Sequence, residues 1–349
     1  MNIISKFKRL IFSLIITFIL LVIIFWKIDF YQLIRLIISF NVKDLFFIII
    51  IYFLSLILRG LRWKYLIRNN TNLKLISLSE IFTVGSALNS YLPLRVGDLW
   101  RAYYLNKEAE NLNINNGNNK QNDKFYIGKT KALASIVLER ILDGVSIVLI
   151  LTFASLIFYS NSDILKLIYI SGILFFGALL FILLIHNFNI IDKIFNFVSR
   201  FIKRNNYIKF LEKIQEITKN FIDGLSCISS IKNLIITIVL SFSIWYCEVC
   251  CVYILLKSFN LDIGISACLF IISFIALSTI IPSTSIFIGP YQLAVIWALS
   301  IYNISKTTSL AIAFVYQGII MLILTVIFII FLLRHNFKLD NLKNLLERS

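Results

Sequence analysis

Two short stretches of a largely apolar sequence carry charged side chains of types that bind phosphate. The first, residues 86–101, reads SALNSYLPLRVGDLWR and follows directly on an apolar segment. The second, residues 137–143, reads VLERILD. Ionisable groups at membrane depth are costly to bury and usually mark a functional site. Together the stretches supply candidate ligands for a lipid headgroup: Asn89, Arg95, Asp98, Arg101, Glu139, Arg140 and Asp143.

Arginine defines the chemistry that these stretches predict. Its planar guanidinium group binds phosphate through two parallel hydrogen bonds. Glu139 and Asp143 lie four residues apart and therefore share one face of a helix. With Asp98 they would orient the arginines and receive any cationic or hydroxyl part of the headgroup. The alternative is that all these charges pair with one another and only fix helix packing. The expected phosphate ligands are Arg95, Arg101 and Arg140.

Glu248 is a lone acid near the middle of another apolar segment. Two roles are open for it: a counter-charge to the arginines, or a proton or cation site. Three cysteines lie close together at 247, 250 and 251, but no histidine is near them, so buried thiols are expected rather than a metal site. We predict no catalytic residue and no cofactor, because the sequence has neither a glycine-rich phosphate loop nor an HExxH motif.

Proline and glycine predict two broken helices that would position the charged stretches. Pro93 removes a backbone donor and Gly97 permits a sharp turn, so the helix before them should end there. Pro282 and Gly289 predict a second break in the C-terminal half. Broken helices in the two halves of a membrane protein are typical of a transporter site near the bilayer midplane. An ordinary loop between two spans is the alternative for the second break.

Composition predicts an integral membrane protein. The 349 residues are 59% hydrophobic, with a mean hydropathy of +0.87. The net charge of +16 arises largely from lysine and arginine in loops, which favours anionic headgroups as partners and excludes nucleic acid. We therefore predict an all-α polytopic fold of about eight transmembrane helices plus re-entrant segments.

The apolar segments form one membrane domain over residues 1–349. The predicted spans are 10–26, 45–58, 133–159, 164–185, 233–256, 263–281, 287–303 and 308–333. Residues 75–92 are interrupted by polar side chains and predict a re-entrant helix. The asparagine-rich stretch within 106–131 predicts a flexible loop. Residues 187–232 predict amphipathic helices on the inner leaflet, because apolar residues recur there at helical spacing.

Basic residues predict the orientation. Lys6, Lys8 and Arg9 precede the first span, and further basic residues follow the last, so both termini are expected in the cytoplasm. Arg59 and Arg62 directly follow the span at 45–58 and are assigned to a cytoplasmic loop. The expected location is the cell membrane, with multiple crossings, and the sequence leaves homo-oligomerisation open.

The motifs resemble those of a known family, the transmembrane region of lysylphosphatidylglycerol synthase, which is flippase-like. NSYLPLRVGDLWRAYYL is similar to its first motif, VLERILD to its E-R-x-x-D motif, and PSTSIFIGPYQLA to its P-x(6)-G-x-x-E pattern. Their order matches, and the resemblance covers nearly the whole chain. Gln292 stands where the family has glutamate, the glycine pair before Gly289 is absent, and the asparagine-rich run resembles an insertion.

The resemblance implies a helix bundle with re-entrant segments and a groove for lipid headgroups. It indicates a stand-alone member, since the chain ends at Ser349 just after the last span and no aminoacyltransferase domain is expected. The favoured function is translocation of an anionic phospholipid or a polyprenyl-phosphate-linked lipid. One alternative is a membrane glycosyltransferase that uses a polyprenyl- or dolichol-phosphate sugar, with Asp98 or Glu139 as base. Another is a scaffold that transports nothing.

Overall fold

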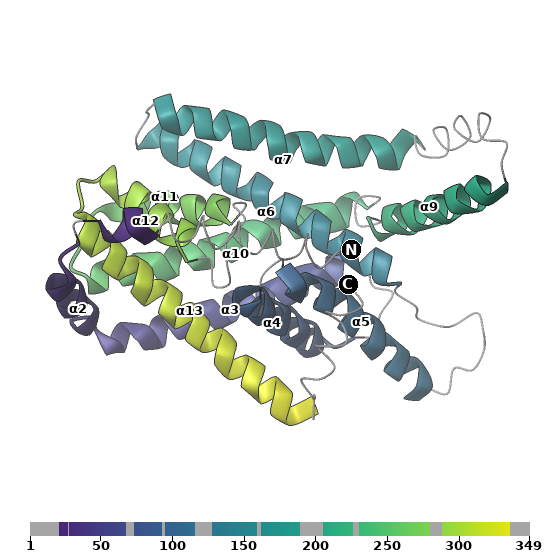
Figure 1. The fold of residues 1–349 in the computed structure, drawn as a ribbon, viewed down its shortest axis with the longest axis horizontal. Helices are drawn as coiled ribbons and strands as arrows, with labels where there is room; N and C mark the ends of the chain where they lie inside the picture. The colour runs from purple at the N-terminus through teal and green to yellow at the C-terminus, as the bar shows by residue number, and fades with distance from the viewer. Residues whose placement is uncertain are drawn as a thin grey trace.

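Helices are the only regular secondary structure in the described part of the chain (Figure 1). The computed structural model describes residues 21–26, 28–67, 73–92, 95–115, 128–158, 162–188, 205–225, 230–279 and 288–335. Within them, five helices are long and apolar enough to cross a membrane. The five are α3 (Val42–Leu66), α6 (Lys129–Ile157), α7 (Ser162–Phe188), α10 (Ile231–Ser258) and α13 (Lys306–His335). The chain is therefore an all-α polytopic membrane protein.

The span predicted at 45–58 belongs to a longer helix. Helix α3 begins at Val42, capped by the side chain of Asn41, and continues to Leu66. It extends because residues 59–66 contain no proline and continue the apolar pattern with Leu61, Trp63 and Leu66. The assignment of Arg59 and Arg62 to a loop is therefore wrong, because both lie within α3, whereas the cytoplasmic side stays a prediction.

Two pairs of shorter helices correspond to the predicted breaks. Helix α4 (Leu75–Tyr91) is followed by α5 (Val96–Asn115), and α11 (Gly264–Ser278) is followed by α12 (Pro290–Ser300). With 15 and 11 residues, α11 and α12 are shorter than the about 17–25 residues that a span requires. The spans predicted at 263–281 and 287–303 are thus shorter in the structure. Pro93 and Pro282 lie outside the described residues.

Other boundaries also differ from the prediction. Helix α5 covers the first ten residues of the loop predicted at 106–131, and residues 116–127 are outside the described part. Within 187–232, α9 (Asn205–Gly224) carries the predicted amphipathic pattern and packs against α6. Helix α2 (Phe30–Ile38) was not predicted. Most of the span predicted at 10–26 is undescribed, so the count of eight spans stays a prediction.

The long helices are arranged so that the polar segments lie inside. Buried apolar side chains of α3, α10, α11, α12 and α13 form one core cluster, and those of α3, α4, α5 and α6 form a second. Helix α7 lies along α6 at the edge of the bundle (Figure 1). Large apolar side chains of α7, such as Ile170, Ile173 and Phe181, are exposed. This face suits contact with lipid, and it leaves α6 between α7 and the interior.

Candidate functional site

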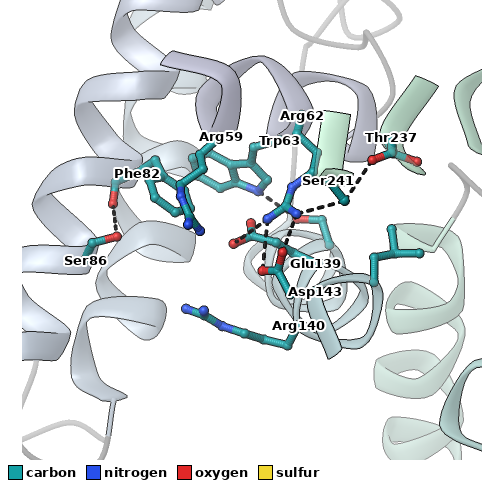
Figure 2. Close-up of polar contacts among 12 residues, drawn as sticks. Arg59, Arg62, Trp63, Phe82, Ser86, Glu139, Arg140, Asp143, Thr237 and Ser241 are labelled. Carbon is teal, nitrogen blue, oxygen red and sulfur yellow. Dashed lines mark hydrogen bonds and ion pairs between the residues drawn. The ribbon is translucent and has the colours of Figure 1, made fainter. Parts of the chain in front are cut away.

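Arg62 on α3 contacts side chains of α6 and α10 (Figure 2). Its two terminal nitrogens donate to the two carboxylate oxygens of Asp143 on α6, over 2.5 and 3.1 Å. One of them also donates to Ser241 on α10, 2.9 Å away, and the other lies 3.6 Å from Glu139. Arg62 is fully buried. A paired geometry of this kind fixes both orientation and distance, so Arg62 holds α3 against α6 and α10.

Arg101 pairs with Glu139 in the same sealed region. The contacts between their nitrogen and oxygen atoms measure 2.8 and 3.4 Å, and both side chains have 0% exposure. The Arg101 guanidinium also lies 4.4 Å from the ring centres of Trp63 and of Phe82. Carboxylate and aromatic faces together compensate the charge, because each attracts a cation. This contact fixes α5 against α6.

Asp98 links α4, α5 and α6. It accepts a hydrogen bond from Asn89 at 2.9 Å, and its backbone N–H donates back to the Asn89 side chain at 3.2 Å. Arg140 donates to the same carboxylate at 3.0 Å, and Arg101 lies 3.8 Å away. The Arg140 side chain is 37% exposed, unlike those of Arg62 and Arg101. Arg140 is therefore more accessible than Arg62 and Arg101.

Arg95 connects the two broken segments. It stands before α5 with φ +54°, and its guanidinium donates to the backbone carbonyl of Thr279, the C-cap of α11, at 2.8 Å. No carboxylate lies within ion-pair distance of Arg95 in the described ranges, although both Arg140 and Asp98 are near enough to act on it electrostatically. Among the described residues, Arg95 is thus a half-buried cation whose hydrogen bond goes to a neutral group.

Two glycines allow α4 and α5 to approach closely enough for these contacts. A Cβ atom at Gly97 would lie 2.8 Å from the backbone nitrogen of Asn89, and one at Gly85 would overlap the side chain of Arg101. Both overlaps are closer than an ordinary Cβ contact, so a side chain at Gly97 would force the two helices apart and one at Gly85 would force Arg101 to shift. The sequence predicts that Gly97 permits a sharp turn. The structure shows a second role, since Gly97 also lets α5 lie close against α4.

Glu248 forms its own polar cluster on α10. Arg59 donates to one carboxylate oxygen at 3.1 Å, Ser55 donates to the same oxygen at 3.2 Å, and Tyr316 on α13 donates to the other at 2.8 Å. The Arg59 guanidinium lies 5.5 Å from the Trp245 ring and 5.8 Å from that of Phe82. Phe82 therefore lies next to both Arg59 and Arg101, and it joins this cluster to the other charges.

The second broken segment is held by neutral groups. The backbone N–H of Gly289, at φ +105°, donates to the side-chain oxygen of Gln292 at 2.8 Å. The Gln292 amide in turn donates to Gln317 on α13 at 2.7 Å. This is the position at which the resemblance would place a glutamate. Gln292 is almost fully buried, and its two hydrogen bonds fix the start of α12.

The structure brings the predicted charges together and adds two that the sequence prediction missed. We call the whole set the interior charge network: Arg59, Arg62, Arg95, Arg101, Arg140, Asp98, Glu139, Asp143 and Glu248. Arg59 and Arg62 were missed because they follow an apolar run. Their three-residue spacing on an unbroken helical pattern is the signal that could have identified them. The role of the predicted residues as lipid ligands stays a prediction.

Comparison of the sequence with known proteins places the chain in a family. The family model described as the lysylphosphatidylglycerol synthase TM region matches residues 10–346. The chain belongs to this family, which confirms the resemblance inferred from the motifs. It is also 28% identical, over 233 residues, to the UPF0104 membrane protein MJ1078 of Methanocaldococcus jannaschii, covering 66% of this chain and 86% of that protein. No solved structure matches the chain significantly.

Proposed function

We propose that this chain is a flippase-like protein that binds the phosphate of a membrane lipid and carries the headgroup across the bilayer. The lipid is a phospholipid or a polyprenyl-phosphate-linked lipid. The observation that carries the proposal is Arg95, a half-buried cation without a carboxylate partner in the described residues. Intramembrane cations of this kind mark substrate pathways, and guanidinium groups bind phosphate strongly.

The network divides into ligands and supports. Arg62 and Arg101 are sealed and already bonded to carboxylates, so they position the helices. Arg95 and the partly exposed Arg140 act electrostatically on each other and bind the phosphate together. Asp98 orients Arg140, and Asn89 orients Asp98. The phosphate ligands are therefore two of the three arginines named by the sequence, and the third, Arg101, supports them.

Translocation would follow the meeting point of the broken segments. Arg95 stands at the start of α5 and donates a hydrogen bond to the C-terminal end of α11. This bond therefore depends on the relative position of the two short-helix pairs. Backbone groups freed at helix breaks are stable at membrane depth only when protein or a watery cavity satisfies them. The headgroup would pass through this polar region while the acyl chains stay in the bilayer. Movement of one helix pair against the other would open the site first to one side of the membrane and then to the other.

Transport of fluorescent anionic lipid in proteoliposomes tests the proposal. Wild-type protein should move the lipid between leaflets, and Arg95→Ala should abolish the movement while the protein stays folded. Arg35→Ala is the matched control, because Arg35 is an exposed arginine on α2 outside the network. A fully active Arg95→Ala protein would show that the site is assigned to the wrong residue. If the protein is a scaffold, neither wild type nor variant would move lipid, and neutralising the charges of both motifs would be harmless.

The enzyme alternative requires a carboxylate that is free to act as base. Asp98 and Glu139 both accept ion pairs from arginine, which opposes such a role. Incubation of the purified protein with a labelled polyprenyl-phosphate sugar separates the two functions. A flippase leaves the sugar on its carrier, whereas a glycosyltransferase consumes it.

The proposed setting is the cell membrane with both termini in the cytoplasm. The support is the basic flanks at Lys6, Lys8 and Arg9 and at the C-terminal end. Labelling of single introduced cysteines near each end with a membrane-impermeant reagent tests the orientation. Labelling of intact cells at either end would contradict it.

A further inference from the structure

The carboxylates of the interior charge network are all occupied by the protein's own arginines. Asp98 pairs with Arg140, Glu139 with Arg101, and Asp143 with Arg62. The fourth, Glu248, accepts from Arg59, and its other oxygen accepts from a tyrosine hydroxyl. A cationic group entering the network would have to displace an arginine, and the displaced arginine would be left buried without a partner.

Aromatic faces are the other groups that bind cations, and three rings beside the network each face an arginine. Phe82 faces the guanidinium groups of both Arg59 and Arg101, at 5.8 and 4.4 Å. Trp63 faces Arg101, and Trp245 faces Arg59. Each ring therefore already has a cation of the protein within the distance at which cation–π attraction acts.

The second broken segment adds no negative charge. Gln292 bonds the Gly289 backbone and Gln317, and both side chains are uncharged. A glutamate at this position would have offered a carboxylate close to the break. Among the described residues, the network thus holds five arginines against four carboxylates, and Arg95 is the arginine bonded to a carbonyl instead.

We infer that this site selects lipids whose headgroup is net anionic and rejects those whose headgroup is net cationic. The selected class includes phosphatidylglycerol and polyprenyl phosphates, and the rejected class includes aminoacylated phosphatidylglycerol. The inference rests on the proposed function in that Arg95 and Arg140 are the ligands of the phosphate. The physical reason is an asymmetry: the guanidinium groups of Arg95 and Arg140 bind an anion, whereas the four carboxylates and three aromatic rings of the network already face arginines of the protein.

Competition binding tests the selectivity without requiring transport. Fluorescent phosphatidylglycerol bound to the purified protein in detergent is displaced by unlabelled phosphatidylglycerol, a polyprenyl phosphate or lysylphosphatidylglycerol. We expect at least one anionic lipid to displace the label at a concentration about tenfold lower, or lower still, than lysylphosphatidylglycerol requires. The stronger of the two anionic competitors identifies the source of the phosphate. Equal or better competition by lysylphosphatidylglycerol, or no binding of the labelled lipid, would overturn the inference.

A pair of variants separates this site from the overall positive charge of the protein. Arg140→Gln and Arg35→Gln each remove one positive charge, but only Arg140 belongs to the network. Arg140→Gln also leaves Asp98 without its closest cation. The preference for anionic lipid should fall about tenfold in Arg140→Gln and stay unchanged in Arg35→Gln. An equal fall in both variants would assign the preference to general electrostatics and refute the inference.

Transport measured beside binding distinguishes the two proposals. Selective binding without any movement of lipid would refute translocation and leave the charge selectivity standing. Equal movement of phosphatidylglycerol and lysylphosphatidylglycerol, dependent on Arg95, would support translocation and refute the selectivity. Movement of anionic lipid alone, with the matching binding preference, supports both.

Discussion

Replacement of Gly97 by alanine is the sharpest test of how α4 and α5 are packed. The added Cβ would lie 2.8 Å from the backbone nitrogen of Asn89 and closer still to the backbone carbonyl oxygen of Gly85, whereas ordinary Cβ contacts begin at 3.4 Å. Both neighbours belong to the α4 backbone, so no side-chain rotation relieves the overlap. Helix α5 as a whole must move away from α4.

The cost of Gly97→Ala follows from that movement. Overpacking of a buried contact costs about 1–3 kcal/mol. Separation of the helices also breaks the two hydrogen bonds between Asn89 and Asp98, each worth about 1 kcal/mol. We therefore expect a loss of about 3–5 kcal/mol in the free energy of unfolding. Lipid transport should also fall, because Arg101 and Asp98 move with α5.

Unfolding by SDS in mixed micelles measures this loss through tryptophan fluorescence, since Trp63 and Trp100 are fully buried near the site. Gly177→Ala is the matched control: a Cβ there meets nothing within 4 Å, and alanine favours a helix by up to about 1 kcal/mol. The control should be neutral or slightly stabilising. If Gly97→Ala unfolded at the same SDS fraction as wild type, the close packing of α4 and α5 would be refuted.

Three further substitutions probe the network. Arg62→Ala removes the ion-pair partner of buried Asp143 and should cost about 3–5 kcal/mol in the same unfolding assay; a loss below 1 kcal/mol would contradict the buried pair. Gly85→Ala places a Cβ in overlap with the buried Arg101 side chain and 3.1 Å from the Gly97 backbone oxygen, so Arg101 must shift and transport should fall, while stability should fall less than in Gly97→Ala, whose closest overlap is with backbone; unchanged transport would refute a positioning role for Arg101. Tyr316→Phe removes one hydrogen bond to Glu248 and should cost about 1.5–3 kcal/mol, which a wild-type unfolding curve would disprove.

The charged motifs could be recognised in the sequence because charged side chains are costly in an apolar segment and are therefore rare there. Glu139 and Asp143 lie on one helix face by their spacing, and an apolar helix must turn such a face inward. The acids were expected to orient Arg95 and Arg101, and the structure pairs Arg101 with Glu139 but bonds Arg95 to the Thr279 carbonyl. The two broken segments were also predicted, since proline and glycine act on the local backbone. Their function as a lipid site stays a prediction.

Partners contributed by other helices could not be predicted. Arg59 and Arg62 lie about 80 or more residues from the carboxylates they bind, and local rules of spacing do not reach that far. The same holds for the contact of Arg95 with Thr279, 184 residues away. Which arginine is sealed and which is reachable is likewise a property of neighbouring helices, because side-chain exposure depends on what packs around it.

The membrane class, the helical fold and the family could be inferred from the amino-acid sequence, because hydropathy and short motifs are local properties of the chain. The pairing of the charges came from the folded structure alone, since ion pairs in a low-dielectric interior form between helices distant in sequence. That pairing separates the supporting arginines, Arg62 and Arg101, from Arg95 and Arg140. It also leaves the site with one more cation than carboxylates, and this excess is the physical basis for the lipid selectivity that we infer.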